Sequence, residues 1–164
     1  MIKPRPATQA AMNLKQPVTV AEIGVYQGVH ALSMFQNLEV EKMYLIDPYE
    51  VYDEPSSGIG KTPDFPDNEQ IARKNLYLFE DRCKWIKKRS QDVELVPVDF
   101  VYIDGSHEYE NVKADLEYYS EVAQKILGGH DYFSKQGVRR AVNEFCLKNN
   151  LKLNMRRPDW WIML

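Results

Sequence analysis

Acidic and histidine side chains gather at the ends of the apolar segments of this 164-residue sequence. The acids at four such ends are Glu22, Asp47, Asp104 and Asp131. All three histidines of the chain lie in or just after these ends, at His30, His107 and His130. Carboxylates can hold a cationic ligand, and imidazoles can accept protons near neutral pH or bind a metal ion.

Short apolar runs alternate with segments of helical periodicity along most of the chain. The expected strands are 19–23, 43–46, 84–86, 99–104 and 126–131, with two closing strands at 151–155 and 160–164. The expected helices are 28–37, 68–82, 108–124 and 137–148. This order predicts an α/β fold with a Rossmann-like doubly wound sheet, mostly parallel with an antiparallel last strand. Ligands of such sheets bind outside the carboxyl ends of the strands, which is where the acids and histidines fall.

We expect residues 18–164 to form one domain, preceded by an N-terminal arm over 1–17 with three prolines and at most a short helix. The segment 48–67 holds four prolines and no apolar period. A loop of this length is usually functional or disordered, so it is either a candidate lid or an insertion without that role. The apolar cluster at 160–164 is expected to be the final strand, with a homodimer contact as the alternative.

The composition excludes several classes of protein. A net charge of −3 and a pI near 5.7 argue against a broad nucleic-acid surface, which needs a basic face. No apolar run approaches the ~20 residues that cross a bilayer, and the N-terminus lacks the apolar core of a signal peptide. The two cysteines form no zinc pattern. We therefore expect a reduced, cytoplasmic protein that contacts neither nucleic acid nor membrane.

The first predicted turn, Glu22 to Gly28, contains two glycines rather than the three of a dinucleotide-binding fingerprint. Tyr26 takes the place of the middle glycine and would crowd a pyrophosphate. Asp47 lies 23 residues after Gly24, where an acid can accept hydrogen bonds from ribose hydroxyls. S-adenosylmethionine, a sulfonium-bearing nucleoside without phosphates, fits this pattern best. Taken singly, each acid is also typical of a turn or a helix cap.

Three segments resemble known methyltransferase motifs. Val20–His30 resembles motif I of class I S-adenosylmethionine-dependent methyltransferases. Phe100–Leu116 resembles the DG-x-H-x-Y-x-x-V-x-x-DL signature of methyltransferase domain family 24, and 128–145 resembles the GGHDY…GV-x-x-AV-x-EF ending of that group. The pattern is also similar to the core of catechol O-methyltransferase. The resemblance implies methyl transfer to a small-molecule acceptor by an O-methyltransferase, with sugar hydroxyls as the first guess.

The same resemblance implies roles for the donor site. Glu22, Gly24 and Tyr26 would line the methionine end, within the turn that Gly28 closes. Asp47 would hold the ribose, and Ser90-Gln91 would meet the adenine. Gly28 and Asp104 are expected to belong to the cofactor site as well. His30 stands where the relative has a serine that helps to hold the methionine carboxylate.

The resemblance also implies roles on the acceptor side. Asp104, His130 and Asp131 match positions that hold a divalent metal, Mg²⁺ or Mn²⁺. The alternative is that His130 and Asp131 bond to each other and to their loop. His107 falls where the relative places its general base, and the alternative for it is an exposed residue at a helix start.

Two other functions stay open from the sequence. A dinucleotide or nucleotide-sugar enzyme is one, against which the missing middle glycine counts. A non-catalytic module that binds S-adenosylmethionine is the other, because the N-terminal helices that help to cover the substrate of larger relatives are nearly absent here.

Overall fold

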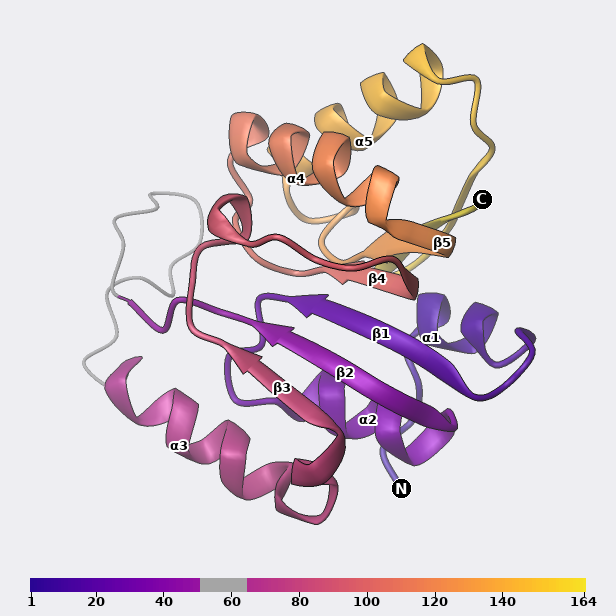
Figure 1. The fold of residues 1–164 in the computed structure, drawn as a ribbon. Coiled ribbons are helices and arrows are strands. Elements are labelled where there is room, and N and C mark those ends of the chain that lie inside the picture. The colour runs from indigo at the N-terminus through magenta and orange to yellow at the C-terminus, as the bar shows by residue number, and fades with distance from the viewer. Residues whose placement is uncertain (51–64) are drawn as a thin grey trace.

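A seven-stranded sheet runs through this computed structural model, which describes residues 1–50 and 65–164 (Figure 1). The strand order is β3-β2-β1-β4-β5-β7-β6. The strands are β1 (Val18–Ile23), β2 (Val40–Ile46), β3 (Cys83–Ile86), β4 (Val98–Ile103), β5 (Ala123–Gly129), β6 (Leu153–Arg156) and β7 (Asp159–Met163). Strands β1 to β5 pair in parallel, whereas β7 pairs antiparallel to both β5 and β6. The predicted fold class is confirmed, as is the interpretation of 160–164 as a closing strand.

Helices cover both faces of the sheet. They are α1 (Pro6–Ala11), α2 (Val29–Asn37), α3 (Phe65–Asn75), α4 (Tyr109–Val122) and α5 (Gln136–Lys148), with short 3₁₀ turns η1 (Tyr77–Arg82) and η2 (Ser90–Asp92). One apolar core lies between the sheet and α1, α2 and α3, and the other lies between the sheet and α4 and α5. Figure 1 shows α4 and α5 on one side of the strands and α1 and α2 on the other.

The sequence pattern explains these layers. Apart from Asp99 near its amino end, strand β4 is apolar because helices cover both of its faces, as parallel strands require. In α4, Val112, Leu116 and Tyr119 are almost fully buried at steps of three and four residues. Strand β1 lies between β2 and β4, so the order of the strands reverses beside it. This reversal is the switch point at which a ligand is expected.

Three predicted elements had boundaries that were wrong by three residues or more. The strand expected over 43–46 begins earlier, at Val40 of β2. The helix expected over 68–82 ends at Asn75 and continues as the 3₁₀ turn η1. Leu76 and Phe79 stand three residues apart, a spacing that an α-helix and a 3₁₀ turn both accommodate. The strand expected over 126–131 is shifted toward the N-terminus. It begins directly after α4, at Ala123, and ends at Gly129, so His130 and Asp131 lie in the following turn.

The N-terminal segment packs on the sheet. Ala7 and Ala11 of α1 are fully buried in the core, and the backbone N–H of Ala7 donates to Asp159 of β7 at 3.0 Å. The division of the chain at residue 17 stays a prediction. Most of the predicted loop 48–67 lies outside the described residues, and so does its candidate role as a lid. No helix in the two described stretches is long and apolar enough to cross a membrane.

Candidate active site

A cavity of about 310 Å³ opens at the carboxyl ends of β1, β2 and β4. Its volume lies at the lower end of the range for small-molecule sites. Four of the predicted donor-site residues line it, namely Gly24, Asp47, Ser90 and Gln91. Sequence reasoning missed the other lining residues, which are Ile23, Ile46, Pro48, Arg89, Gly105, Ser106, Glu108 and Asn111. The topology thus brings segments far apart in the chain to one cavity at the predicted edge of the sheet.

Gly24 lets the turn after β1 approach the end of β4. Its backbone is left-handed, with φ +84°, and a Cβ built there would lie 2.1 Å from the carbonyl oxygen of Asp104. No other residue type fits this position without moving one of the two strands. Gly28 is not among the residues that line the cavity, and its contact with a cofactor stays a prediction. A Cβ at Gly28 would meet Ala72 of α3 at 3.2 Å. Gly28 therefore serves helix packing in this structure.

Asp47 follows β2 and fixes the turn after β1. Its Oδ2 accepts the backbone N–H groups of Val25 and Tyr26, both at 2.9 Å, and its Oδ1 accepts the N–H of Tyr49 at 2.8 Å. Burial raises the pKa of the carboxyl group, and these three hydrogen bonds oppose that rise. The sequence spacing placed Asp47 at the cavity, but nothing in the spacing indicated that it also holds the turn.

Ser90 is held in position by two side chains of helix α4. Its hydroxyl donates to Asp115 at 2.6 Å, and the Tyr119 hydroxyl donates to its carbonyl oxygen at 2.9 Å. Burial raises the pKa of Asp115 to about 6. The η2 turn, which carries Ser90 and Gln91 on the cavity wall, is thus positioned by the buried face of α4.

Glu22 and His30 form a buried pair beside the cavity rather than on its wall. His30 Nδ1 lies 2.8 Å from Glu22 Oε1, and His30 Nε2 lies 3.0 Å from the hydroxyl of Thr8 in α1. Burial disfavours charge on both groups, raising the pKa of Glu22 to about 8 and lowering that of His30 to about 3. Contact of either residue with a methionine group stays a prediction. Tyr26, by contrast, is 44% exposed.

Replacement of Glu22 with Gln should change how stability depends on pH. The ordinary pKa of 4.5 rises to about 8 on folding, so the folded protein holds this proton more tightly than the unfolded chain. Relative to the Glu22→Gln variant, the wild type should therefore lose a few kcal/mol of unfolding free energy from about pH 5 to pH 9. Urea unfolding at several pH values measures this, with the exposed Glu39→Gln as control. Parallel stability curves for wild type and Glu22→Gln would contradict the assignment.

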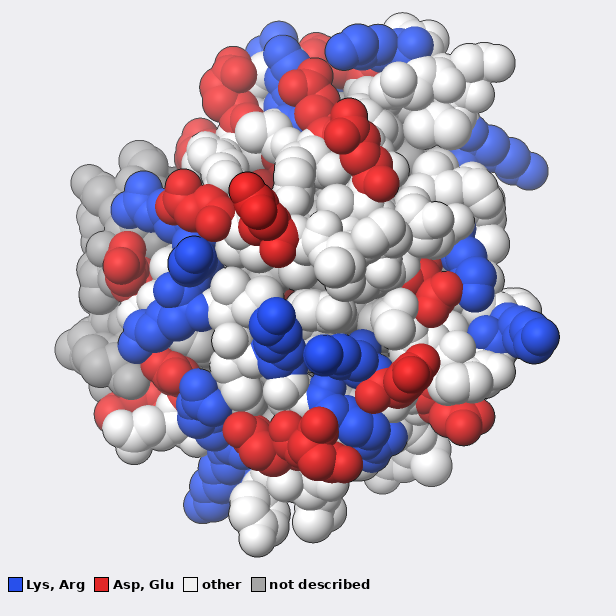
Figure 2. Space-filling view, viewed as in Figure 1, with Lys and Arg blue, Asp and Glu red and all other residues white. Residues whose placement is uncertain are grey.

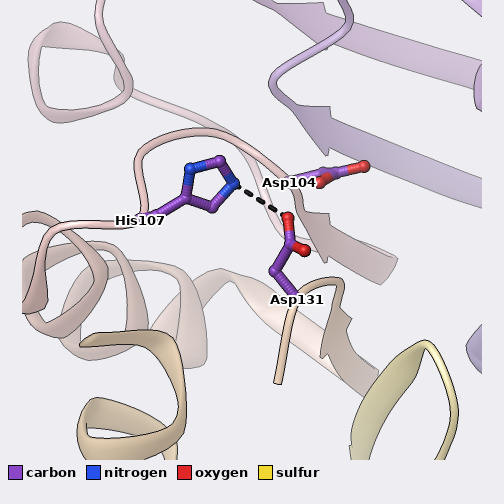
Figure 3. Close-up of side chains that lie close together, drawn as sticks. All are labelled: Asp104, His107 and Asp131. Carbon is purple, nitrogen blue, oxygen red and sulfur yellow. Dashed lines mark hydrogen bonds and ion pairs between the residues drawn. The ribbon is translucent and has the colours of Figure 1, made fainter. Parts of the chain in front are cut away.

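Asp104, His107, His130 and Asp131 form a second cluster next to the cavity. His107 Nε2 lies 2.8 Å from Asp131 Oδ2, and Figure 3 shows the imidazole pointing toward this carboxylate with Asp104 close by. His130 Nδ1 lies 3.1 Å from Asp131 Oδ2 and 3.5 Å from Asp104 Oδ1. His107 is only 8% exposed, so the alternative of an exposed residue at a helix start was wrong.

Charges in this cluster favour an ionised Asp131. Burial raises its pKa, but hydrogen bonds from His107, His130 and Ser134 outweigh burial and hold it well below its usual range. The same pairing raises the pKa of His130 against the effect of its burial. The arrangement is that of a carboxylate orienting an imidazole, which suits a general base.

The fit of a divalent metal to this cluster is poor. One ligand atom each from Asp104, His107 and Asp131 lies within 4.8 Å of the others, and His130 is nearby, so carboxylate and imidazole donors are present. However, the guanidinium of Arg5 lies 2.8 Å from Asp104 Oδ2. Binding of an ion by Asp104, His130 and Asp131 stays a prediction, and the Arg5 contact is the observation against it.

The sequence profile of a methyltransferase domain, family 24, matches residues 21–132 of this chain, about two thirds of its length. The chain belongs to this family. The match includes the end of β1, the glycine turn, Asp47, Ser90 and the cluster around Asp104. The family membership expected from the motifs is thereby confirmed.

A curated relative and several solved structures are similar to this methyltransferase domain. The relative is the uncharacterised protein R132 of Acanthamoeba polyphaga mimivirus, 26% identical over 148 residues, and the match covers 79% of this chain and 60% of that protein. The chain therefore spans about 60% of that relative's length.

Three solved methyltransferase structures share the fold at low identity. The precorrin-6y C5,15-methyltransferase of Geobacter metallireducens is 10% identical, with a TM-score of 0.67 and coverage of 95% of this chain and 83% of its own. A protein assigned as an RNA methyltransferase of Pyrococcus horikoshii is 14% identical, with a TM-score of 0.66 and coverage of 96% and 80%. The O-methyltransferase of Bacillus cereus, solved with S-adenosylhomocysteine, is 15% identical, with a TM-score of 0.61 and coverage of 96% and 77%. The acceptors named for these proteins differ, so the fold alone leaves the acceptor open.

Proposed function

We propose that this chain transfers the methyl group of S-adenosylmethionine to a hydroxyl group of a small-molecule acceptor. The observation that carries the proposal is the cavity at the switch point of the sheet, walled by Gly24, Asp47, Ser90 and Gln91 in a member of a methyltransferase family. In an open α/β sheet this is the place where a nucleoside ligand binds.

In this proposal the nucleoside half of the donor lies between β2 and η2. Asp47 lines the cavity, and its carboxylate oxygens have lone pairs beyond the three backbone hydrogen bonds that they accept, so it can also receive ribose hydroxyls. Ser90 and Gln91 would meet the adenine on the facing wall. Asp47 and the Ser90–Gln91 pair stand on separate elements, and each is fixed by the contacts described above. This arrangement supports a preorganised site.

The charge of the donor also suits this edge of the sheet. Burial raises the pKa of Glu22 and Asp47, because each of these carboxylates loses water without an ion-pair contact to a lysine or arginine among the described residues. A sulfonium cation bound beside them would favour the ionised forms and gain attraction in return. A polyphosphate would instead meet repulsion, which disfavours a dinucleotide.

Methyl transfer to a hydroxyl needs a group that removes its proton. His107, oriented by Asp131, is our candidate for this base, and Ser106 and Glu108 on either side of it line the donor cavity. The methyl carbon forms its bond to the acceptor oxygen as its bond to sulfur breaks, and the hydroxyl proton passes to the imidazole. The remaining product is S-adenosylhomocysteine.

The proposal of a small-molecule acceptor rests on surface charge. Figure 2 shows lysine and arginine side chains interspersed with acidic ones on the face that it displays. A mixed face of this kind differs from the single basic surface that nucleic-acid binding favours.

S-adenosylmethionine should raise the thermal stability of the protein, whereas NAD should not. A ligand present at 100 times its Kd stabilises the folded state by about 2.7 kcal/mol, or roughly 5–10 °C in Tm for a chain of this size. Thermal-shift measurements with both compounds and with S-adenosylhomocysteine test this. A shift with NAD alone, or none with either sulfur nucleoside, would overturn the donor assignment. Donor binding without turnover on any hydroxyl acceptor would favour a non-catalytic module.

A further inference from the structure

We propose that Arg5 is the resident cation of the Asp104 carboxylate and that its guanidinium excludes a divalent metal from this end of the sheet. Arg5 Nη1 lies 2.8 Å from Asp104 Oδ2 and donates to the Tyr102 hydroxyl at 2.9 Å. Both charged side chains are mostly covered, with 32% of Arg5 and 20% of Asp104 exposed. The charge on Asp104 is thus already matched by a group of the chain itself.

The N-terminal segment holds Arg5 in this position. Asp159 of β7 accepts the backbone N–H of Ala7 at 3.0 Å through one oxygen and the Tyr102 hydroxyl at 2.9 Å through the other. Thr8 contacts His30 at 3.0 Å on the same side of the sheet. The partners are buried groups of β7, β4 and α2, so Arg5 is anchored by the residues that follow it in the chain and through its own side chain.

An ion at Asp104 would have to compete with this arrangement. Metal–oxygen bonds of about 2.0–2.6 Å would place a double positive charge within a few ångströms of the guanidinium, where like charges repel strongly. Asp131, the second carboxylate of the cluster, is likewise engaged, since both His107 and His130 lie within hydrogen-bonding distance of its Oδ2. Each carboxylate therefore has a partner in the chain that an ion would have to displace.

For the reaction, this means that Arg5 neutralises Asp104 while the His107–Asp131 pair takes up the acceptor proton. With a fixed monovalent cation at Asp104, the acceptor hydroxyl gains no acidification from a metal, and its deprotonation depends on the His107–Asp131 pair. This consequence rests on the proposed function. The exclusion of metal does not, because it concerns binding by the protein without donor or acceptor.

Titration with Mn²⁺, followed by calorimetry and by the electron paramagnetic resonance of the free ion, tests the proposal. The wild type should bind Mn²⁺ no more tightly than about 1 mM, the weak end of protein cation sites. Arg5→Gln should bind it about tenfold more tightly or better, and Asp104→Asn added to Arg5→Gln should abolish the gain. Arg5→Lys keeps the charge and should behave as the wild type. Arg156→Ala, which removes an arginine that contacts Gln9 of α1, is the matched control and should also leave Mn²⁺ binding unchanged.

Two results would overturn the proposal. One is micromolar binding of Mn²⁺ to the wild type that Asp104→Asn removes. The other is a folded Arg5→Gln variant, checked by circular dichroism, that binds Mn²⁺ no better than the wild type. If Arg5→Gln does not fold, the wild-type and Arg5→Lys titrations decide alone, and tight binding by either overturns the exclusion. Failure of the proposed function would appear separately, as the absence of a thermal shift with S-adenosylmethionine.

Discussion

Replacement of His107 with Asn should lower kcat by about 10²–10⁴-fold, the usual contribution of a general base, while leaving the affinity for S-adenosylmethionine nearly unchanged. The imidazole is buried and held by Asp131 at 2.8 Å, so the carboxylate fixes its orientation and stabilises the imidazolium that proton transfer creates. Asparagine keeps a polar side chain of similar reach but cannot accept the proton. Steady-state kinetics with a hydroxyl acceptor, together with calorimetry of donor binding, separates the two effects.

The pH profile distinguishes a catalytic from a structural role for His107. Protonation of the imidazole at low pH removes the base, so wild-type kcat should fall as the pH falls, whereas the residual activity of His107→Asn should lack this acid limb. Asp131 stays ionised over this range because its pKa is held well below the usual value. Tyr109→Phe, which loses one exposed hydrogen bond to Glu144, is the nearby control and should keep both rate and profile. An unchanged kcat in a folded His107→Asn protein would remove His107 from the mechanism.

Periodicity was a reliable guide to the fold where each element buries a single face or is apolar throughout. Strand β4 is such an element because it is buried almost throughout, and helix α4 is one because it buries residues at steps of three and four. It failed at α3, where Leu76 and Phe79 fit two kinds of helix, and at the start of β5. There the chain passes from α4 to the strand at Ala123 without a loop, so no turn residues mark the boundary.

The candidate site likewise contains residues that the sequence could place and a residue that it could not. Gly24, Asp47, Ser90 and Gln91 could be placed at the cavity because strand ends of a doubly wound sheet meet at one edge. Arg5 could not be placed from the sequence. It stands in a proline-containing stretch without periodicity, and its partner Asp104 is 99 positions away, so only the folded structure brings them together.

The same limit applies to contacts within the site. The contact of His30 with Thr8 depends on how α1 packs over the sheet, which the pattern of a six-residue helix does not indicate. The contact of His30 with Glu22 depends on how α2 packs against β1. Sequence reasoning could therefore assign residues to the edge of the sheet. It could not determine which of them face the cavity and which face each other.

Asp47→Ala should weaken S-adenosylmethionine binding by about 10- to 100-fold, corresponding to the ~1.5–3 kcal/mol of hydrogen bonds to a charged group. The substitution should also lower the free energy of unfolding by about 2–4 kcal/mol, because the N–H groups of Val25, Tyr26 and Tyr49 lose their acceptor. The two effects have one cause, since the carboxylate that would receive the ribose also fixes the turn after β1. Calorimetry measures the first effect, and urea unfolding measures the second.

Asp99→Ala separates loss of the ribose contact from general loss of stability. Asp99 accepts the backbone N–H of Thr19 at 2.8 Å and pairs with Lys125 at 2.7 Å. Its replacement with Ala therefore also removes the acceptor of a backbone N–H at the end of a strand. It stands near the amino end of β4, whereas the cavity lies at the carboxyl end. We therefore expect Asp99→Ala to lose stability and to bind S-adenosylmethionine as the wild type does. If Asp47→Ala is folded and keeps wild-type affinity, Asp47 serves the turn alone, and the ribose must be held by other residues of the cavity.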